Sequence, residues 1–160
     1  LLAGAQGVVN SANPGLVGPA RPEYWMFAAH AGASVEEALH QAAGPELLRA
    51  CQALPLREGS EGVRCPEGEA VVTKGTLGLL PDGYVIHAVA PRWHAVETSL
   101  PALTGAWRAV LRLASDLRIR TLSAPALGCG AKRAPLGAAA RAWAAALAEH
   151  ERSARCEHFE

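Results

Sequence analysis

Short apolar runs that end in turn residues predict buried strands in this chain. The first run, Val8–Val9, leads into a pair of asparagines, Asn10 and Asn13, and then into a Pro-Gly turn. Two side-chain amides are therefore expected where this strand meets its loop. Tyr84–Val89 is apolar almost throughout, which is typical of a strand covered on both faces. Further strands are predicted over 69–74, 122–125 and 156–160.

Between these runs, apolar residues recur at helical spacing. Ser34 and Glu37 form a capping box at the start of the first predicted helix. Gly44–Pro45 ends that helix and begins a second one. Longer apolar stripes predict a helix over 100–117 and another that begins at Pro135. Strands that alternate with helices in one domain predict an α/β fold, a three-layer α/β/α sandwich with a mixed central sheet.

Composition and charge then exclude several classes of protein. The 160 residues suffice for one domain with a core, and Lys+Arg balances Asp+Glu at 15 each. A neutral chain lacks the basic excess that nucleic-acid and membrane-surface proteins need, and no apolar run is long enough to span a bilayer. The four cysteines are scattered without a Cys-x-x-Cys pattern, which favours reduced thiols. We therefore expect a cytoplasmic or nuclear protein without a bound metal or cofactor.

The two ends of the sequence indicate a longer protein. The sequence begins on apolar Leu1–Leu2 and closes on Cys156–Glu160, which has the pattern of an unfinished strand. We expect residues 1–160 to form a single domain, a fragment of a parent chain that carries flanking domains.

Two predicted loops share a design that suits an anion. Gly32-Ala33-Ser34 leads into the first helix, and Gly128-Cys129-Gly130 lies between a strand and the helix that Pro135 starts. Small residues at a helix N-terminus leave backbone N–H groups and the helix dipole available to a negative charge. Two such loops on one crevice would suit a diphosphate. Ordinary turn chemistry is the alternative for the glycines, and also for the two asparagines.

Taken in order, four stretches resemble the macrodomains, a family of modules that bind ADP-ribose and in some members hydrolyse it. Val8–Asn13 resembles the family's V-N-A-A-N strand end. Val35–Leu48 (V-E-E-A-L-H-Q-A-A-G-P-E-L-L) is similar to its V-D-x-A-I-H-x-A-A-G helix. Cys65–Gly75 and Val85–Pro91 resemble its central strand pair, and Pro125–Gly130 its second phosphate loop. The resemblance implies a macrodomain-like fold over almost the whole chain.

The family's functional residues can be transferred position by position. Asn13 matches the asparagine that contacts the distal ribose in hydrolytic members, and Glu36 stands where those members often have an aspartate that orients water. If the protein is hydrolytic, the resemblance makes Asn13 and Glu36 its catalytic residues. It assigns ligand binding to Asn10, Asn13, Gly32, Ala33, Ser34, Val35, Leu127, Gly128, Cys129, Gly130, Ala131 and Lys132.

Some positions depart from the family pattern. The first phosphate loop, normally a run of glycines, is Gly32-Ala33-Ser34, and each added Cβ hinders close approach of backbone to phosphate. Lys132 replaces an aromatic residue that stacks on the distal ribose in many members; it could serve a phosphate as a point charge. The strand whose aspartate reads adenine in the family precedes the matching stretches, so adenine selectivity is not predicted.

Three further side chains fit either chemistry or packing. His40 lies one turn after Glu36, and both a structural and a functional role are open. His87 lies inside a predicted buried strand, where a hydrogen-bonded core histidine is the commoner case. Cys129 near a helix start could have a lowered pKa and act as a nucleophile, but no pattern places a histidine against it.

Three functions therefore compete: a module that binds ADP-ribose or a mono-ADP-ribosylated protein, a mono-ADP-ribosyl hydrolase, and a degenerate module that contacts protein partners. The retained asparagines and glycines favour binding over degeneracy. Glu36 in the first turn of its helix is expected to have a low pKa, which would make it a weak base. We therefore expect binding with little turnover.

Overall fold

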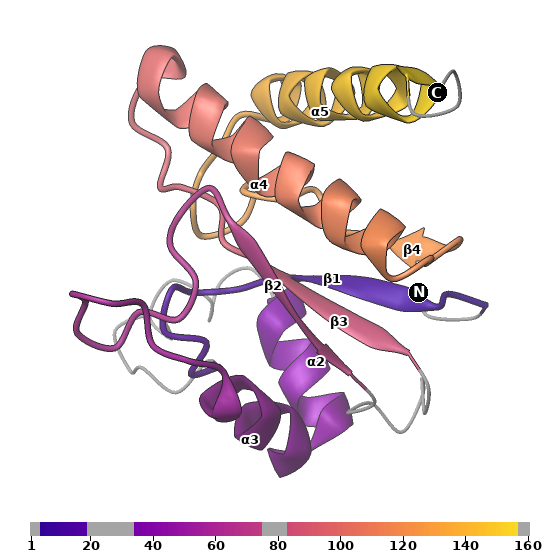
Figure 1. Ribbon diagram of the computed structural model, residues 1–160. Coiled ribbons are helices and arrows are strands. Elements are labelled where there is room, and N and C mark those ends of the chain that lie inside the picture. The colour runs from indigo at the N-terminus through magenta and orange to yellow at the C-terminus, as the bar shows by residue number, and fades with distance from the viewer. Residues whose placement is uncertain (1–3, 19–33, 75–82, 157–160) are drawn as a thin grey trace.

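The computed structural model describes residues 4–18, 34–74 and 83–156 (Figure 1). Its elements carry the labels of Figure 1, and in chain order they are β1 (Gly7–Ser11), α2 (Val35–Ala43), α3 (Pro45–Ala53), β2 (Ala70–Lys74), β3 (Tyr84–Ala88), α4 (Val96–Asp116), β4 (Leu122–Ser123) and α5 (Leu136–Cys156). In the described part of the chain, no helix is both long and apolar enough to cross a bilayer.

The four strands form one mixed sheet in the order β2-β3-β1-β4. β1 runs parallel to β3 and to β4, whereas β2 pairs antiparallel with β3. Ser11 at the end of β1 pairs with Ala88 at the end of β3, and Ala12 N extends the ladder by donating to Ala88 O at 3.0 Å. The segments that follow β1 and β3 therefore leave the sheet at the same edge, where ligands of α/β proteins bind.

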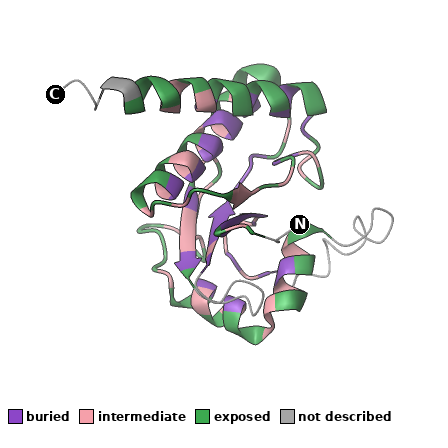
Figure 2. Ribbon diagram, turned by 90° about the vertical axis from the view of Figure 1, so that its right-hand side faces the viewer, coloured by how far each residue is buried: buried purple, intermediate pink, exposed green. Residues whose placement is uncertain are grey.

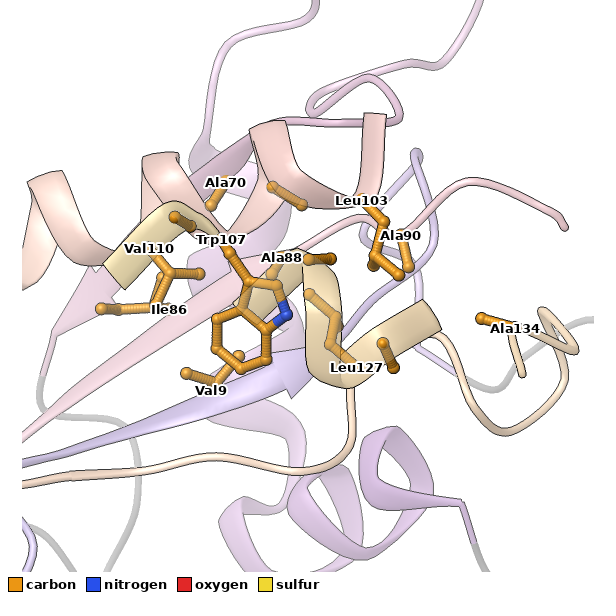
Figure 3. Close-up of a cluster of buried hydrophobic side chains, with 14 of the residues drawn as sticks. Val9, Ala70, Ile86, Ala88, Ala90, Leu103, Trp107, Val110, Leu127 and Ala134 are labelled. Atoms are coloured by element: carbon orange, nitrogen blue, oxygen red, sulfur yellow. The ribbon is translucent and has the colours of Figure 1, made fainter. Parts of the chain in front are cut away.

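Helices cover the sheet on both faces, with α4 and α5 on one side and α2 and α3 on the other (Figure 1). Neighbouring strand residues point to opposite faces. On the side of α4, Val9 and Ile86 pack with Leu103, Trp107 and Val110 (Figure 3). On the other side, the buried core consists of Val8, Ala12, Leu16, Leu39, Leu47, Cys51, Cys65, Val85 and Val89.

Burial follows this layered plan (Figure 2). The central strands are buried, and the outward faces of the helices are exposed. The predicted α/β fold, a three-layer sandwich with a mixed sheet, is thus what the structure shows.

Most predicted elements are found close to their expected places. The predicted N-cap of α2 is confirmed, because Glu37 N donates to Ser34 Oγ at 3.1 Å, whereas the Glu37 carboxylate accepts from Gln41 Nε2. Three predictions of extent were wrong. β4 has only two residues, and α4 begins at Val96 with Pro101 inside it. Cys156, expected in a strand, is the last residue of α5, and residues 157–160 lie outside the described ranges.

Candidate functional site

Asn13 stands just beyond β1 and joins two parts of the sheet edge. Its Nδ2 donates to Glu36 Oε1 at 3.0 Å and to Gly18 O at 3.2 Å, and its Oδ1 accepts from Val17 N at 3.4 Å. One amide thus holds the loop after β1 against the first turn of α2. The alternative of turn chemistry is partly correct, since the amide does cap this loop, but the bond to a carboxylate goes beyond it.

Glu36 is the ionisable group at the centre of the site. It lies in the first turn of α2, and burial raises its pKa from 4.5 to about 6; the hydrogen bonds from Asn13 and the charge of Lys132 oppose this rise. The expectation of a low pKa was wrong, because desolvation outweighs the helix dipole here. A carboxyl group that titrates near pH 6 is suited to accept a proton near neutral pH.

His40, one turn after Glu36, packs against the loop that Asn13 holds. A Cβ added to Gly18 would lie 3.1 Å from His40 Cε1 and 3.2 Å from both ring nitrogens. Gly18 also has φ +67°, which disfavours any side chain there. Burial lowers the pKa of His40, which favours the neutral ring. His40 thus helps to place Gly18, whose carbonyl accepts from Asn13.

Asn10 belongs to a buried network beneath the site. It is 0% exposed, and its Nδ2 lies 3.2 Å from His87 Nδ1. His87 Nε2 lies 2.9 Å from Thr73 Oγ1, and burial lowers the pKa of His87 to about 4. These partners imply a neutral ring that accepts at Nδ1 and donates from Nε2. His87 is thus a satisfied core histidine, whereas a direct contact between Asn10 and a ligand stays a prediction.

The second loop follows β4 on the other side of the site. Gly128 is buried with φ +84°, and a Cβ there would lie 3.3 Å from Ala134 Cβ. Cys129 N donates to Ala126 O, and Ala134 N donates to Gly128 O. Gly130 is exposed, with no atom within 4 Å of an added Cβ. Burial raises the pKa of Cys129, which argues against its use as a thiolate nucleophile.

Lys132 ties this loop to its neighbours. Its Nζ lies 2.9 Å from Glu67 Oε1, and its carbonyl accepts from Trp93 N at 2.8 Å. Glu67 Oε1 also accepts from Arg92 N at 3.3 Å. Because β4 runs parallel to β1, the second loop leaves the sheet at the same end as the turn that carries Asn13. The charge of Lys132 also lowers the pKa of Glu36.

The structure thus groups Asn13, Glu36 and Lys132 and places Asn10 below them. Ser34 is the N-cap of α2 and Val35 its first residue, both exposed, whereas Gly32 and Ala33 lie outside the described residues. Leu127 is buried in the core under α4, and Ala131 is exposed. Among the described residues, no group of His, Cys, Asp or Glu side chains could hold a metal ion.

Sequence reasoning missed Gly18 and Glu67. A glycine three residues after a Pro-Gly turn gives no sign that a histidine from another element will press against it. Glu67 lay within a predicted central stretch and was not associated with Lys132, since the two are far apart in the sequence. Only the fold brings these pairs together.

Comparison with known proteins identifies the family. The family model of the macro domain matches residues 9–143. The chain belongs to the macro domain family. The match runs from within β1 to the first turns of α5, so it includes both loops and the Asn13–Glu36 pair.

Relatives and solved structures agree with this assignment. The macro domain is 40% identical over 134 residues to the O-acetyl-ADP-ribose deacetylase of Enterobacter cloacae subsp. cloacae, covering 83% of the chain and 64% of that relative. It superposes with a TM-score of 0.70 and 30% identity on the Oceanobacillus iheyensis macrodomain with ADP, over 89% of the chain and 67% of that structure. For the Trypanosoma brucei macrodomain in complex with ADP-ribose, the TM-score is 0.69 at 27% identity, and the superposition covers 93% of the chain and 53% of that structure.

The chain spans less than two thirds of the length of that deacetylase. Membership of the family therefore establishes the fold and its matched core. Activity, substrate and partners need a separate argument.

Proposed function

We propose that this macro domain binds ADP-ribose at the sheet edge between the first turn of α2 and the loop over 127–132. The observation that carries the proposal is the hydrogen bond of 3.0 Å between Asn13 Nδ2 and Glu36 Oε1 at the carboxyl end of β1. That pair lies where the ligands of α/β proteins bind. The structural neighbours solved with ADP and ADP-ribose support the same ligand.

The second loop supplies groups that suit a diphosphate. Within the described part of the chain, the backbone N–H groups of Gly130, Ala131 and Lys132 donate to no protein acceptor. Successive free amides form a concave anion site, and Gly130 leaves space for close approach. The ammonium of Lys132 adds one positive charge beside them. We propose that these groups hold the phosphates and that Asn13 contacts the distal ribose.

Calorimetry with ADP-ribose tests the proposal, with AMP as the control. We expect ADP-ribose to bind more tightly than AMP, because AMP lacks the second phosphate and the distal ribose. Asn13→Ala should weaken binding, whereas Gln41→Ala, on an exposed face of α2, should leave it unchanged. Equal affinity for AMP and ADP-ribose, or no binding of either, would refute the proposal.

A second candidate function is hydrolysis of an ester-linked ADP-ribosyl group, either of a small acetyl ester or of a mono-ADP-ribosylated protein. The pKa of Glu36 near 6 favours it, because the ionised carboxylate is available at neutral pH as a general base for water. The 40% identity to a deacetylase of an ADP-ribose ester supports the same reaction class. The expectation of little turnover rested partly on a low pKa and loses that part of its support, whereas the altered Gly32-Ala33-Ser34 loop still counts against turnover.

Turnover distinguishes the two functions. Acetate release from O-acetyl-ADP-ribose should be lost in both Glu36→Gln and Asn13→Ala if the domain is a hydrolase. The rate should fall about tenfold for each pH unit below pH 6, as the base becomes protonated. Tight binding without release of acetate from O-acetyl-ADP-ribose or of ADP-ribose from a mono-ADP-ribosylated protein would leave binding as the function.

A further inference from the structure

Arg64 links two parts of the molecule through three backbone carbonyls. Its Nη1 donates to Gly15 O at 3.1 Å, its Nε to Leu54 O at 3.2 Å and its Nη2 to Gln52 O at 3.4 Å. Gln52 lies in the last turn of α3, and Leu54 is the residue that caps it. Gly15 lies two residues after Asn13. One side chain therefore connects the end of α3 to the turn that follows the site asparagine.

The backbone of the same segment strengthens this link. Arg64 N and Cys65 N both donate to Pro14 O, at 2.8 and 3.0 Å. A Cβ added to Gly15 would lie 3.2 Å from Gly62 O, so the turn after Asn13 packs closely on this segment.

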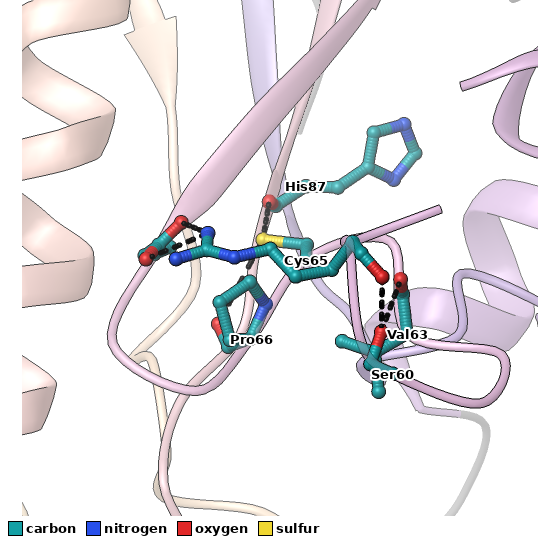
Figure 4. A network of polar contacts seen from close by, with 7 residues as sticks. Ser60, Val63, Cys65, Pro66 and His87 are labelled. Carbon is teal, nitrogen blue, oxygen red and sulfur yellow. Dashed lines mark hydrogen bonds and ion pairs between the residues drawn. The ribbon is translucent and has the colours of Figure 1, made fainter. Parts of the chain in front are cut away.

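The segment itself is fixed to the sheet. Cys65 is 0% exposed, and its Sγ lies 4.0 Å from His87 O of β3 (Figure 4). Ser60 Oγ donates to the carbonyls of Arg57 and Val63, which closes the preceding loop on itself (Figure 4). The segment that carries Arg64 is therefore held both by the sheet and by its own loop.

The two ends of this link carry the two partners of the site. α3 follows α2 directly through Gly44, and α2 carries Glu36. The Pro14–Gly15 turn carries Asn13. We propose that Arg64 is a positioning residue, which sets the α2–α3 pair and the turn after β1 at the separation that the Asn13–Glu36 hydrogen bond requires. This proposal deepens the proposed function and rests on it for its effect on ligand binding.

An arginine suits this task better than other side chains. Its planar guanidinium presents five donors in a fixed arrangement, so it can reach three carbonyls at set positions, whereas lysine is a flexible point charge. The carbonyls at the end of α3 also form the negative end of a helix dipole, which favours a cation. Loss of the side chain would leave those carbonyls and Gly15 O without their donor.

The pKa of Glu36 reports on positioning independently of ligand binding. The hydrogen bonds from Asn13 lower that pKa, and burial raises it. If the turn that carries Asn13 moves away from α2, the hydrogen bonds from Asn13 to Glu36 weaken while the Glu36 carboxyl group stays buried. The carboxyl group then titrates at a higher pH. A residue that only stabilises the fold would change the unfolding midpoint and leave this titration in place.

The test compares Arg64→Lys and Arg64→Met with Arg57→Gln. Arg57 lies in the same loop and its Nη1 contacts both carboxylate oxygens of Glu69, at 2.9 and 3.1 Å, but this contact is exposed and includes neither the turn after Asn13 nor α3. The Glu36 carboxyl carbon is titrated by NMR, and ADP-ribose affinity is measured by calorimetry. We expect a raised Glu36 pKa in both Arg64 variants and an affinity loss of roughly five- to tenfold, the size of one lost hydrogen bond. Arg57→Gln should change neither.

The outcomes separate this inference from the function. An unchanged Glu36 pKa and unchanged affinity in folded Arg64→Lys and Arg64→Met would overturn the positioning role. A shifted pKa in a protein that binds no ADP-ribose would support positioning and refute the proposed function. If Arg64→Met does not fold, Arg64→Lys decides, because it retains the positive charge and most of the apolar stem but has its donors on a single nitrogen.

Discussion

Replacing Glu36 by glutamine is predicted to stabilise the macro domain near neutral pH. The native carboxyl group is partly buried, and burial raises its pKa from 4.5 to about 6. An acid whose pKa is higher in the folded state destabilises that state whenever it is ionised. Glutamine keeps an oxygen that can accept from Asn13 Nδ2, but it carries no charge that burial penalises.

The size of the effect follows from the pKa shift. Each pKa unit corresponds to about 1.4 kcal/mol, so ionised Glu36 lowers the free energy of unfolding by up to about 2 kcal/mol. The penalty is complete above the folded-state pKa near 6 and disappears below the unfolded-state value of 4.5. The gain from Glu36→Gln should therefore be about 2 kcal/mol at pH 7.5 and only about 0.4 kcal/mol at pH 4.5. In a chain of this length, 2 kcal/mol raises Tm by roughly 4–8 °C.

Urea unfolding at the two pH values measures this difference. Glu37→Gln is the matched control, because Glu37 lies in the same first turn and its Oε1 accepts from Gln41 Nε2 at 3.2 Å on an exposed face. Glu37 gains only from the helix dipole and that contact, so its replacement should destabilise by about 0.3–1 kcal/mol. If Glu36→Gln destabilises the domain as Glu37→Gln does, the carboxyl group is an ordinary first-turn acid and the reasoning is refuted.

Further variants examine the loops around the site. Gly130→Glu should abolish ADP-ribose binding without unfolding, because its Cβ meets no atom within 4 Å and the new charge repels phosphate; unchanged calorimetric affinity would place the diphosphate elsewhere. Lys132→Ala should weaken ADP-ribose binding by about 1 kcal/mol in low salt and by less in high salt. Glu67→Gln should tighten binding, because it removes the carboxylate that pairs with the Lys132 ammonium. Gly18→Ala should lower both Tm and affinity, since its Cβ presses on His40 at 3.1 Å; a wild-type Tm would show that the ring moves aside freely.

The fold could be predicted well wherever local signals determine it. Ser34 predicts the start of α2 because an N-cap hydroxyl accepts from a backbone N–H of its own helix, a contact that needs no other part of the chain. Tyr84–Val89 could be predicted as a central strand because a strand covered on both faces is apolar almost throughout. Predictions failed where the local signal was ambiguous. A proline in the first turns hid the start of α4, and Cys156, the first residue of a predicted strand, is the last residue of α5.

The site was harder to predict than the fold, because two identical residues have different surroundings in the structure. Asn10 and Asn13 are three positions apart, and the sequence offers the same amide twice. Asn10 is still within β1 and points into the core under α2 and α3, where it contacts His87. Asn13 lies beyond the strand and reaches Glu36. Side chains alternate between the two faces of a strand, so the two asparagines point in different directions. The residue at which β1 ends must be known before the buried asparagine can be told from the one at the site.

The pKa of Glu36 shows why a site cannot be judged from its own element. The helix dipole is local to α2 and argues for a low pKa, whereas desolvation depends on every segment that packs around the carboxyl group. One of those segments, the turn after β1, is held by Arg64 from a loop that sequence analysis gave no role. The acid–base behaviour of Glu36 therefore depends on a residue that does not touch it. For the same reason, a macro domain that keeps the asparagine and the carboxylate but has a different residue in place of Arg64 is expected to keep its fold and to have a different carboxyl pKa at its site.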